Sequence, residues 1–158
     1  YSLRRNILQE MGARLKLYGY VYDGYAAHIN TLQSYYDRSM ELLSTAVRQA
    51  LFCPQRPVYG KENDSPSGYI DPDGGCVNSL IADGCDIRGS VKNCILFRNV
   101  RIERGASVEN CILFKDTVVK KGASLHSVIT DKYVTVSENV ILTGHERYPM
   151  VVAKGVTV

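Results

Sequence analysis

The chain has 158 residues, 45% of them hydrophobic, and its 19 basic and 16 acidic side chains give a formal net charge of +3. That length supports one or two domains, and without a run of about 18 apolar residues or a secretory leader pattern no membrane span or secretion is indicated. Scattered charges argue against nucleic-acid binding, and five cysteines without zinc-type spacing indicate reduced thiols in the cytoplasm.

Residues 1–51 are predicted to form a helix, a strand and a second helix. The second helix is the clearest, because apolar residues recur on one face at steps of three and four. These residues are Leu32, Tyr36, Met40, Leu43, Val47 and Ala50. Asn30 is the expected N-cap, and Gln33 would complete a capping box with it. Because the first residue is Tyr1 and not methionine, we expect a C-terminal piece of a longer protein.

Residues 52–75 are predicted to be a linker. Prolines and glycines follow one another there and interrupt any periodic pattern. Each proline fixes its φ angle and removes a hydrogen-bond donor, so we expect this stretch to be partly extended.

Residues 76–158 repeat themselves with a period of about 17 residues, which indicates a repeat fold. The segment Val91–Phe97 (VKNCILF) returns as Val108–Phe114 (VENCILF). Branched aliphatic residues recur every five or six positions, and a smaller residue often stands two positions before them. Because strand side chains alternate between faces, both members of such a pair point to the same side.

Short strands of this kind, three to a coil, are predicted to wind into a triangular prism. The aliphatic residues fill its interior, and equivalent positions stack into ladders such as Ile102, Val119 and Val136. Cys94 and Cys111 fall on the small inward position, where packing is favoured over a redox or metal role. We therefore predict a mainly β chain, a parallel β-helix of hexapeptide repeats preceded by the short helix-strand-helix segment.

The segment Gly24–Thr31 (GYAAHINT) and the helix behind it resemble the Gly-Tyr-Trp-X-Asp-Ile-Gly-Thr segment that ends a sugar-nucleotidyltransferase domain. With the linker and the β-helix, nearly the whole chain resembles glucose-1-phosphate adenylyltransferase (ADP-glucose pyrophosphorylase). Within that family it is most similar to the regulatory, GlgD-type subunits of bacterial glycogen biosynthesis. The resemblance implies that residues 1–51 end the nucleotidyltransferase domain and that the β-helix is left-handed.

The resemblance also carries an expectation about activity. Catalytic members hold a magnesium ion with an aspartate in this segment, where the present chain has His28. A neutral imidazole is a poor magnesium ligand, so we expect a regulatory and assembly module without catalytic residues, metal ligands or cofactors of its own. Magnesium and ATP are implied only for a catalytic partner subunit, and self-association is the other expected contact.

Two enzyme alternatives stay open. The parent could be an active sugar-1-phosphate nucleotidyltransferase, and His28 is the residue that discriminates against it. A hexapeptide acyltransferase would use a histidine such as His126 or His145 as general base and would bind coenzyme A. The acyltransferase is less favoured, because the Gly-Tyr segment and its helix have no place in that family.

The resemblance further implies an effector site for a phosphorylated metabolite. Plant-type relatives use an Asp-Lys pair in a β-helix turn and a lysine near the last strand, which match Asp131, Lys132 and Lys154 here. A lysine ammonium is a flexible point charge suited to phosphate. The alternative is a solvated turn, since turns in any β-helix favour Asp and Lys.

An outward-facing apolar stripe is predicted from the strand alternation. The residue before each inward aliphatic should face outward, yet one such column is aliphatic and has aromatic neighbours. The predicted interface residues are Leu80, Ile95, Phe97, Ile112, Phe114 and Ile129. Such a stripe is too large to leave in water, so we expect another domain or subunit to cover it, with the helix in residues 31–51 as the local alternative.

Overall fold

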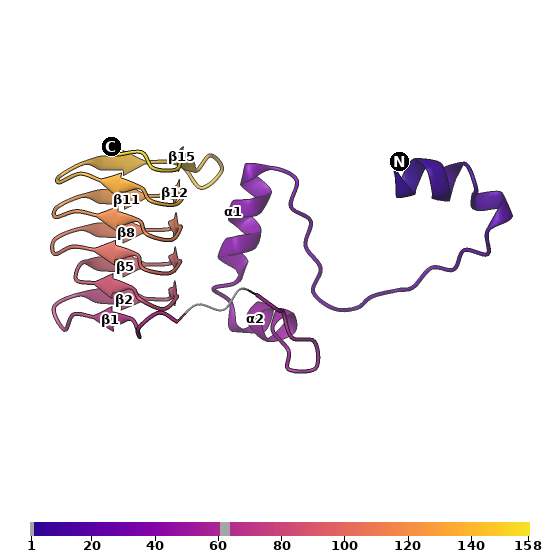
Figure 1. Cartoon of the computed structure of the whole chain (residues 1–158), viewed down its shortest axis with the longest axis horizontal. Helices are drawn as coiled ribbons and strands as arrows, with labels where there is room; N and C mark the ends of the chain where they lie inside the picture. The colour runs from indigo at the N-terminus through magenta and orange to yellow at the C-terminus, as the bar shows by residue number, and fades with distance from the viewer. Residues whose placement is uncertain (1, 61–63) are drawn as a thin grey trace.

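The computed structural model describes residues 2–60 and 64–158, and their main body is a parallel β-helix (Figure 1). Its described strands form three five-stranded sheets, here called sheets A, B and C. Sheet A contains β1 (Tyr69–Ile70), β4 (Asp86–Ile87), β7 (Arg101–Ile102), β10 (Val118–Val119) and β13 (Thr135–Val136). Sheet B contains β2 (Gly75–Val77), β5 (Ser90–Lys92), β8 (Ser107–Glu109), β11 (Ser124–His126) and β14 (Ile141–Thr143). Sheet C contains β3 (Leu80–Ile81), β6 (Ile95–Leu96), β9 (Ile112–Leu113), β12 (Val128–Thr130) and β15 (Met150–Val152).

The register confirms a coil of three strands. Each strand pairs in parallel with the strand three places further along the chain, so one coil stacks on the next. Ile102 pairs with Val119, and Val119 pairs with Val136, which is the predicted ladder. The first coil begins earlier than predicted, because β1 lies inside the expected linker and pairs with β4. A strand of two residues is too short to show a period. Among the prolines and glycines of the expected linker, β1 could therefore not be recognised from the sequence.

The interior of the prism is a single hydrophobic cluster. Its fully buried members include Ile87, Leu96, Ile102 and Leu125, and each such side chain contributes roughly 1.5–3 kcal/mol on burial. Free thiols of Cys85, Cys94 and Cys111 fill small inward positions in the same cluster. Thr130, which stands where sheet C otherwise places an inward aliphatic residue, is also buried. Its hydroxyl shares a 3.0 Å hydrogen bond with the hydroxyl of Thr117, so neither buried hydroxyl lacks a partner.

The corners of the coil depend on residues that tolerate a positive φ angle. Asn78, Asn93 and Asn110 have φ angles of 43°, 51° and 54°, in the left-handed region that asparagine enters more easily than most residues. Their side chains also form a ladder, in which the Asn78 amide donates to Asn93 at 2.8 Å and the Asn93 amide to Asn110 at 3.2 Å. The repeated asparagines therefore both turn the chain and join successive coils.

The N-terminal region differs from the prediction. It contains a short π-helix, η1 (Leu3–Gln9), a 3-10 turn, η2 (Gly12–Arg14), and two α-helices, α1 (Leu32–Glu41) and α2 (Thr45–Leu51). The expected strand is wrong, since residues 2–60 hold none, and the single long helix is divided between α1 and α2.

The start of α1 also lies one residue later than predicted. Its N-cap is Thr31, whose hydroxyl accepts from the Ser34 amide while the Ser34 hydroxyl accepts from the Thr31 amide. The capping box therefore uses Thr31 and Ser34 in place of Asn30 and Gln33. The helices of the described residues are all too short or too polar to cross a bilayer.

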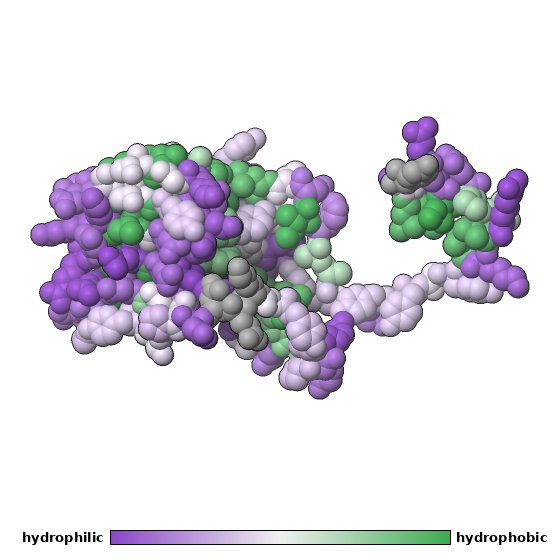
Figure 2. Space-filling model, viewed as in Figure 1, coloured by the Kyte–Doolittle hydropathy of each residue, from purple (hydrophilic) through white to green (hydrophobic). Residues whose placement is uncertain are grey.

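The segment before α1 extends away from the β-helix (Figure 1). Its hydrophobic side chains face solvent, as the space-filling view shows (Figure 2). Leu3 is 69% exposed and Val21 is 80% exposed. By contrast, α1 lies beside the β-helix, and this contact bears directly on the predicted stripe (Figure 1).

Candidate functional site

Four basic residues stack at one corner of the β-helix. The sheet C register aligns Leu96, Leu113, Thr130 and Val152, and two residues beyond each of them lies a basic side chain. These four residues, here called the basic column, are Arg98, Lys115, Lys132 and Lys154. Main-chain hydrogen bonds hold the turn together, with Tyr133 N donating to Lys115 O at 3.1 Å and Gly155 N to Lys132 O at 3.0 Å. Neighbouring coils lie about 4.8 Å apart, so the column concentrates like charge.

Tyr133 organises two of these ammonium groups. Lys115 Nζ lies 5.1 Å from the centre of its ring, and Lys154 Nζ lies 5.8 Å from it, both within the range of cation–π attraction. The hydrogen bond with Tyr133 raises the pKa of Lys115 above its ordinary value, so this lysine is charged at neutral pH. Lys115 also lies 3.5 Å from the carboxylate of Asp116.

A hollow of about 290 Å³ opens beside the basic column. Its lining residues are Phe97, Arg98, Phe114, Lys115 and Lys132. The two phenylalanine rings pack against each other with centroids 4.7 Å apart, and Phe114 lies 6.3 Å from the Tyr35 ring of α1. An aromatic floor with a cationic rim suits an anion that carries an apolar or planar part.

The predicted effector residues reach this corner, but with different surroundings. Lys132 and Lys154 occupy equivalent positions on successive coils, both exposed to solvent. Asp131 is half-buried, and its carboxylate accepts a 2.7 Å hydrogen bond from the Lys132 amide, so it shapes the turn. The sequence reasoning missed Arg98 and Lys115, although their spacing of 17 residues from each other and from Lys132 was a visible signal.

The apolar stripe lies under α1. Ile95, Ile112 and Ile129 form a second cluster, separate from the prism core, with Tyr36 of the helix. Leu80, Phe114, Tyr35, Met40 and Leu43 pack against this cluster at its edges. Ile112 is 0% exposed, whereas Phe97 at the rim is 38% exposed. Within this chain the cover is therefore the local helix, and a contact with another subunit at these residues stays a prediction.

The three histidines lie apart from the basic column. His28 is exposed in the extended stretch before α1. His126 lies within 3.4 Å of the Asn110 amide and 3.2 Å of the Ser127 hydroxyl, and it continues the asparagine ladder. His145 accepts a 3.1 Å hydrogen bond from the Arg147 amide in the hairpin before β15. Residues 2–60 and 64–158 contain no group of three or more His, Cys, Asp or Glu side chains placed to hold a metal.

Comparison with known proteins gives consistent matches. Residues 68–158 match the family described as GlmU-like, C-terminal hexapeptide. The chain is 41% identical over 98% of its length to the glycogen biosynthesis protein GlgD of Bacillus subtilis (strain 168), and it spans 45% of that relative. It is 46% identical over 43% of its length to GlgD of Geobacillus stearothermophilus, covering 20% of that protein. A glucose-1-phosphate adenylyltransferase of Acetivibrio thermocellus is 36% identical over 57% of the chain, which covers 21% of that enzyme.

Proposed function

Because the chain belongs to the GlmU-like C-terminal hexapeptide family and resembles GlgD along 98% of its length, we propose a regulatory and assembly role in glycogen biosynthesis. The chain would serve as the C-terminal module of a glucose-1-phosphate adenylyltransferase-like subunit in the cytoplasm. The observation that carries the proposal is the basic column, which gathers Lys132 and Lys154 with two further cations beside an aromatic hollow.

The regulatory part of the proposal depends on phosphate binding at that column. A phosphorylated metabolite would place its phosphate between Lys132 and Lys154 and its remaining part against Phe97 and Phe114. Phe114 touches both this hollow and Tyr35 of α1, so a bound ligand would alter the packing of the helix on sheet C. Ligand binding shifts an equilibrium only when the two states differ in affinity, and a ligand that displaces Phe114 from Tyr35 would create such a difference.

The assembly part concerns the partner subunits. We propose contact with a catalytic glucose-1-phosphate adenylyltransferase subunit, with a second copy of this subunit, or with both. Magnesium and ATP would then act in the catalytic partner, because the imidazole of His28 does not match the oxygen ligands that magnesium prefers. In this proposal, the present chain binds the effector and forms the contact with the neighbouring subunit.

An active sugar-1-phosphate nucleotidyltransferase is the second candidate. The observation in its favour is the 36% identity, over 57% of the chain, to the Acetivibrio thermocellus adenylyltransferase. The two candidates differ in what the full-length subunit does alone. Without a catalytic partner, a regulatory subunit would form no ADP-glucose, whereas an active enzyme would form it from magnesium-bound ATP and glucose 1-phosphate.

The deciding experiment measures ADP-glucose formation by the full-length subunit alone, by a catalytic subunit alone and by their mixture. Each sample is measured with and without inorganic phosphate and a sugar bisphosphate as probes. We expect the subunit alone to be silent and the mixture to respond to the probe more strongly than the catalytic subunit does. An unmixed subunit with robust turnover would replace this proposal by the second candidate.

A further inference from the structure

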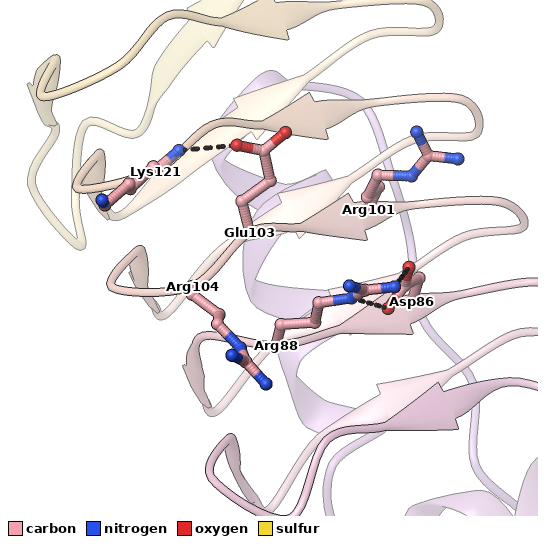
Figure 3. A pocket seen from close by; sticks show the side chains of 6 residues that line it. All are labelled: Asp86, Arg88, Arg101, Glu103, Arg104 and Lys121. Carbon is pink, nitrogen blue, oxygen red and sulfur yellow. Dashed lines mark hydrogen bonds and ion pairs between the residues drawn. The ribbon is translucent and has the colours of Figure 1, made fainter.

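A second charged hollow, of about 650 Å³, lies on sheet A and shares no lining residue with the hollow beside the basic column (Figure 3). Its lining residues are Asp86, Arg88, Arg101, Glu103, Arg104 and Lys121. Four of them are basic and two are acidic. All come from β4, β7 and the turns that follow sheet A strands, so successive coils bring them together.

Both acidic side chains of this hollow are engaged by neighbours (Figure 3). The carboxylate of Asp86 accepts two hydrogen bonds from the guanidinium of Arg88, both at 2.9 Å. Glu103 accepts a 3.0 Å hydrogen bond from the main-chain amide of Lys121. The Asp86 contact fixes the direction of Arg88 and leaves its remaining N–H groups available, because a guanidinium has five donors.

A buried carboxylate outside the lining fixes a second guanidinium. The Asp71 side chain is 7% exposed and accepts a 3.0 Å hydrogen bond from Nη2 of Arg104, which is 67% exposed. The Asp73 amide and then Arg104 hold the pKa of Asp71 below its ordinary value, so the carboxylate stays charged. The buried Asp71 carboxylate thus orients the Arg104 guanidinium, and the largely exposed Arg104 side chain keeps further N–H groups available to a ligand.

Two cations of the hollow have no partner among the described residues. Within the described part of the chain, the guanidinium of Arg101 and the ammonium of Lys121 form no hydrogen bond or ion pair. They extend from neighbouring coils at the rim of the same hollow (Figure 3). Their charges are therefore available to an anionic ligand.

We propose that this hollow binds a phosphate-bearing small molecule independently of the basic column. Arg88 and Arg104, oriented by Asp86 and Asp71, offer the planar donor pairs that match phosphate oxygens. Arg101 and Lys121 supply the two unpaired charges that balance a dianion. Because two of the guanidinium groups are already held in place, less side-chain entropy is lost on binding.

The test is a calorimetric titration of the 158-residue chain with inorganic pyrophosphate at constant ionic strength. We expect saturable binding, and Arg101→Gln and Lys121→Gln should each weaken it about tenfold, the scale of one charge-assisted contact. Lys120→Gln is the matched control, because this neighbouring lysine lies outside the lining. It removes the same charge and should change affinity less than about twofold.

A double variant separates this hollow from the basic column. Lys132→Gln combined with Lys154→Gln should leave the binding that depends on Arg101 and Lys121 in place. The proposal is overturned if pyrophosphate does not bind saturably, if Lys120→Gln weakens binding as much as Lys121→Gln, or if only the double variant abolishes it.

Discussion

The hydroxyl of Tyr36 donates a 2.7 Å hydrogen bond to the main-chain oxygen of Asn110, 74 positions further along the chain. This bond joins α1 to the β-helix, and Tyr36 is only 4% exposed. Gln33 adds a second tie, since its side-chain nitrogen donates to the main-chain oxygen of Glu146 at 2.8 Å. The helix is therefore held over sheet C at two places besides its apolar contact.

Tyr36→Phe should loosen this contact without unfolding the β-helix. The variant removes the hydrogen bond to the Asn110 carbonyl, which is part-buried, and the loss of such a bond costs about 1 kcal/mol. Faster proteolytic cleavage between α1 and β1, at an unchanged β-sheet circular dichroism signal, is the expected result. Tyr18→Phe is the control, because Tyr18 is 89% exposed. Equal cleavage rates for wild type and Tyr36→Phe would show that the hydrogen bond does not hold the helix.

Ile112 and Leu113 are adjacent in β9 but belong to different hydrophobic clusters. Both are 0% exposed, but Ile112 packs under α1 whereas Leu113 belongs to the prism core. A buried unpaired carboxylate costs several kcal/mol, so Leu113→Glu should unfold the β-helix, while Ile112→Glu should release α1 and leave the sheets intact. Circular dichroism and limited proteolysis measure the two effects.

Ile141→Glu is the control for this pair, because Ile141 is 74% exposed and should tolerate the charge. If Ile112→Glu unfolds the sheets as Leu113→Glu does, the two side chains belong to one cooperative layer. Sedimentation of the full-length subunit with the same variants shows whether the stripe also contributes to subunit contact.

Lys132→Gln and Lys154→Gln should each reduce the response of the assembled enzyme to a phosphorylated effector. Both side chains are exposed, so their loss should leave the melting temperature nearly unchanged. The measurement is the activation curve of the full-length subunit mixed with its catalytic partner. Lys120→Gln controls for the loss of one charge. If the activation curves of Lys132→Gln and Lys154→Gln coincide with that of this control, the two lysines belong to a solvated turn and bind no effector.

His28→Asp should not turn the full-length subunit into an efficient enzyme. A single carboxylate supplies one oxygen ligand, whereas magnesium needs several ligands in a near-octahedral arrangement. The expected result is little ADP-glucose from either the wild-type or the His28→Asp subunit, measured without a partner at saturating magnesium. High turnover by the wild-type subunit alone would contradict the regulatory assignment.

The cysteines should differ in reactivity. Burial, followed by the neighbouring Cys94, raises the pKa of Cys111 well above its ordinary value, whereas the contact with Arg56 lowers the pKa of Cys53. Only the thiolate reacts readily, so alkylation near pH 8 should label Cys53 first and Cys111 only on unfolding. Mass spectrometry of partly alkylated protein locates the label, and early modification of Cys111 would mean that the coil opens locally.

The repeat region could be predicted from the sequence by itself. The 17-residue period, the strand alternation and the inward Cys94 and Cys111 all follow from nearly identical segments that occupy equivalent places in a stack. The same period contained the basic column, since Arg98, Lys115 and Lys132 are spaced by one coil. Where structure repeats with the sequence, local spacing determines which side chains become neighbours.

The tertiary structure alone decided which unlike elements meet. That α1 covers Ile112 depends on how a helix outside the repeat packs against the prism. No period links Tyr36 of α1 with Ile112, and their contact forms only if the intervening chain can close the distance at an acceptable loss of entropy. Asp71 meets Arg104 because β1, the strand that the sequence period did not reveal, stacks on the later coils of sheet A. The sequence thus determined the stack through its local period, while the packing of α1 on sheet C depends on a long-range contact that has no local signal.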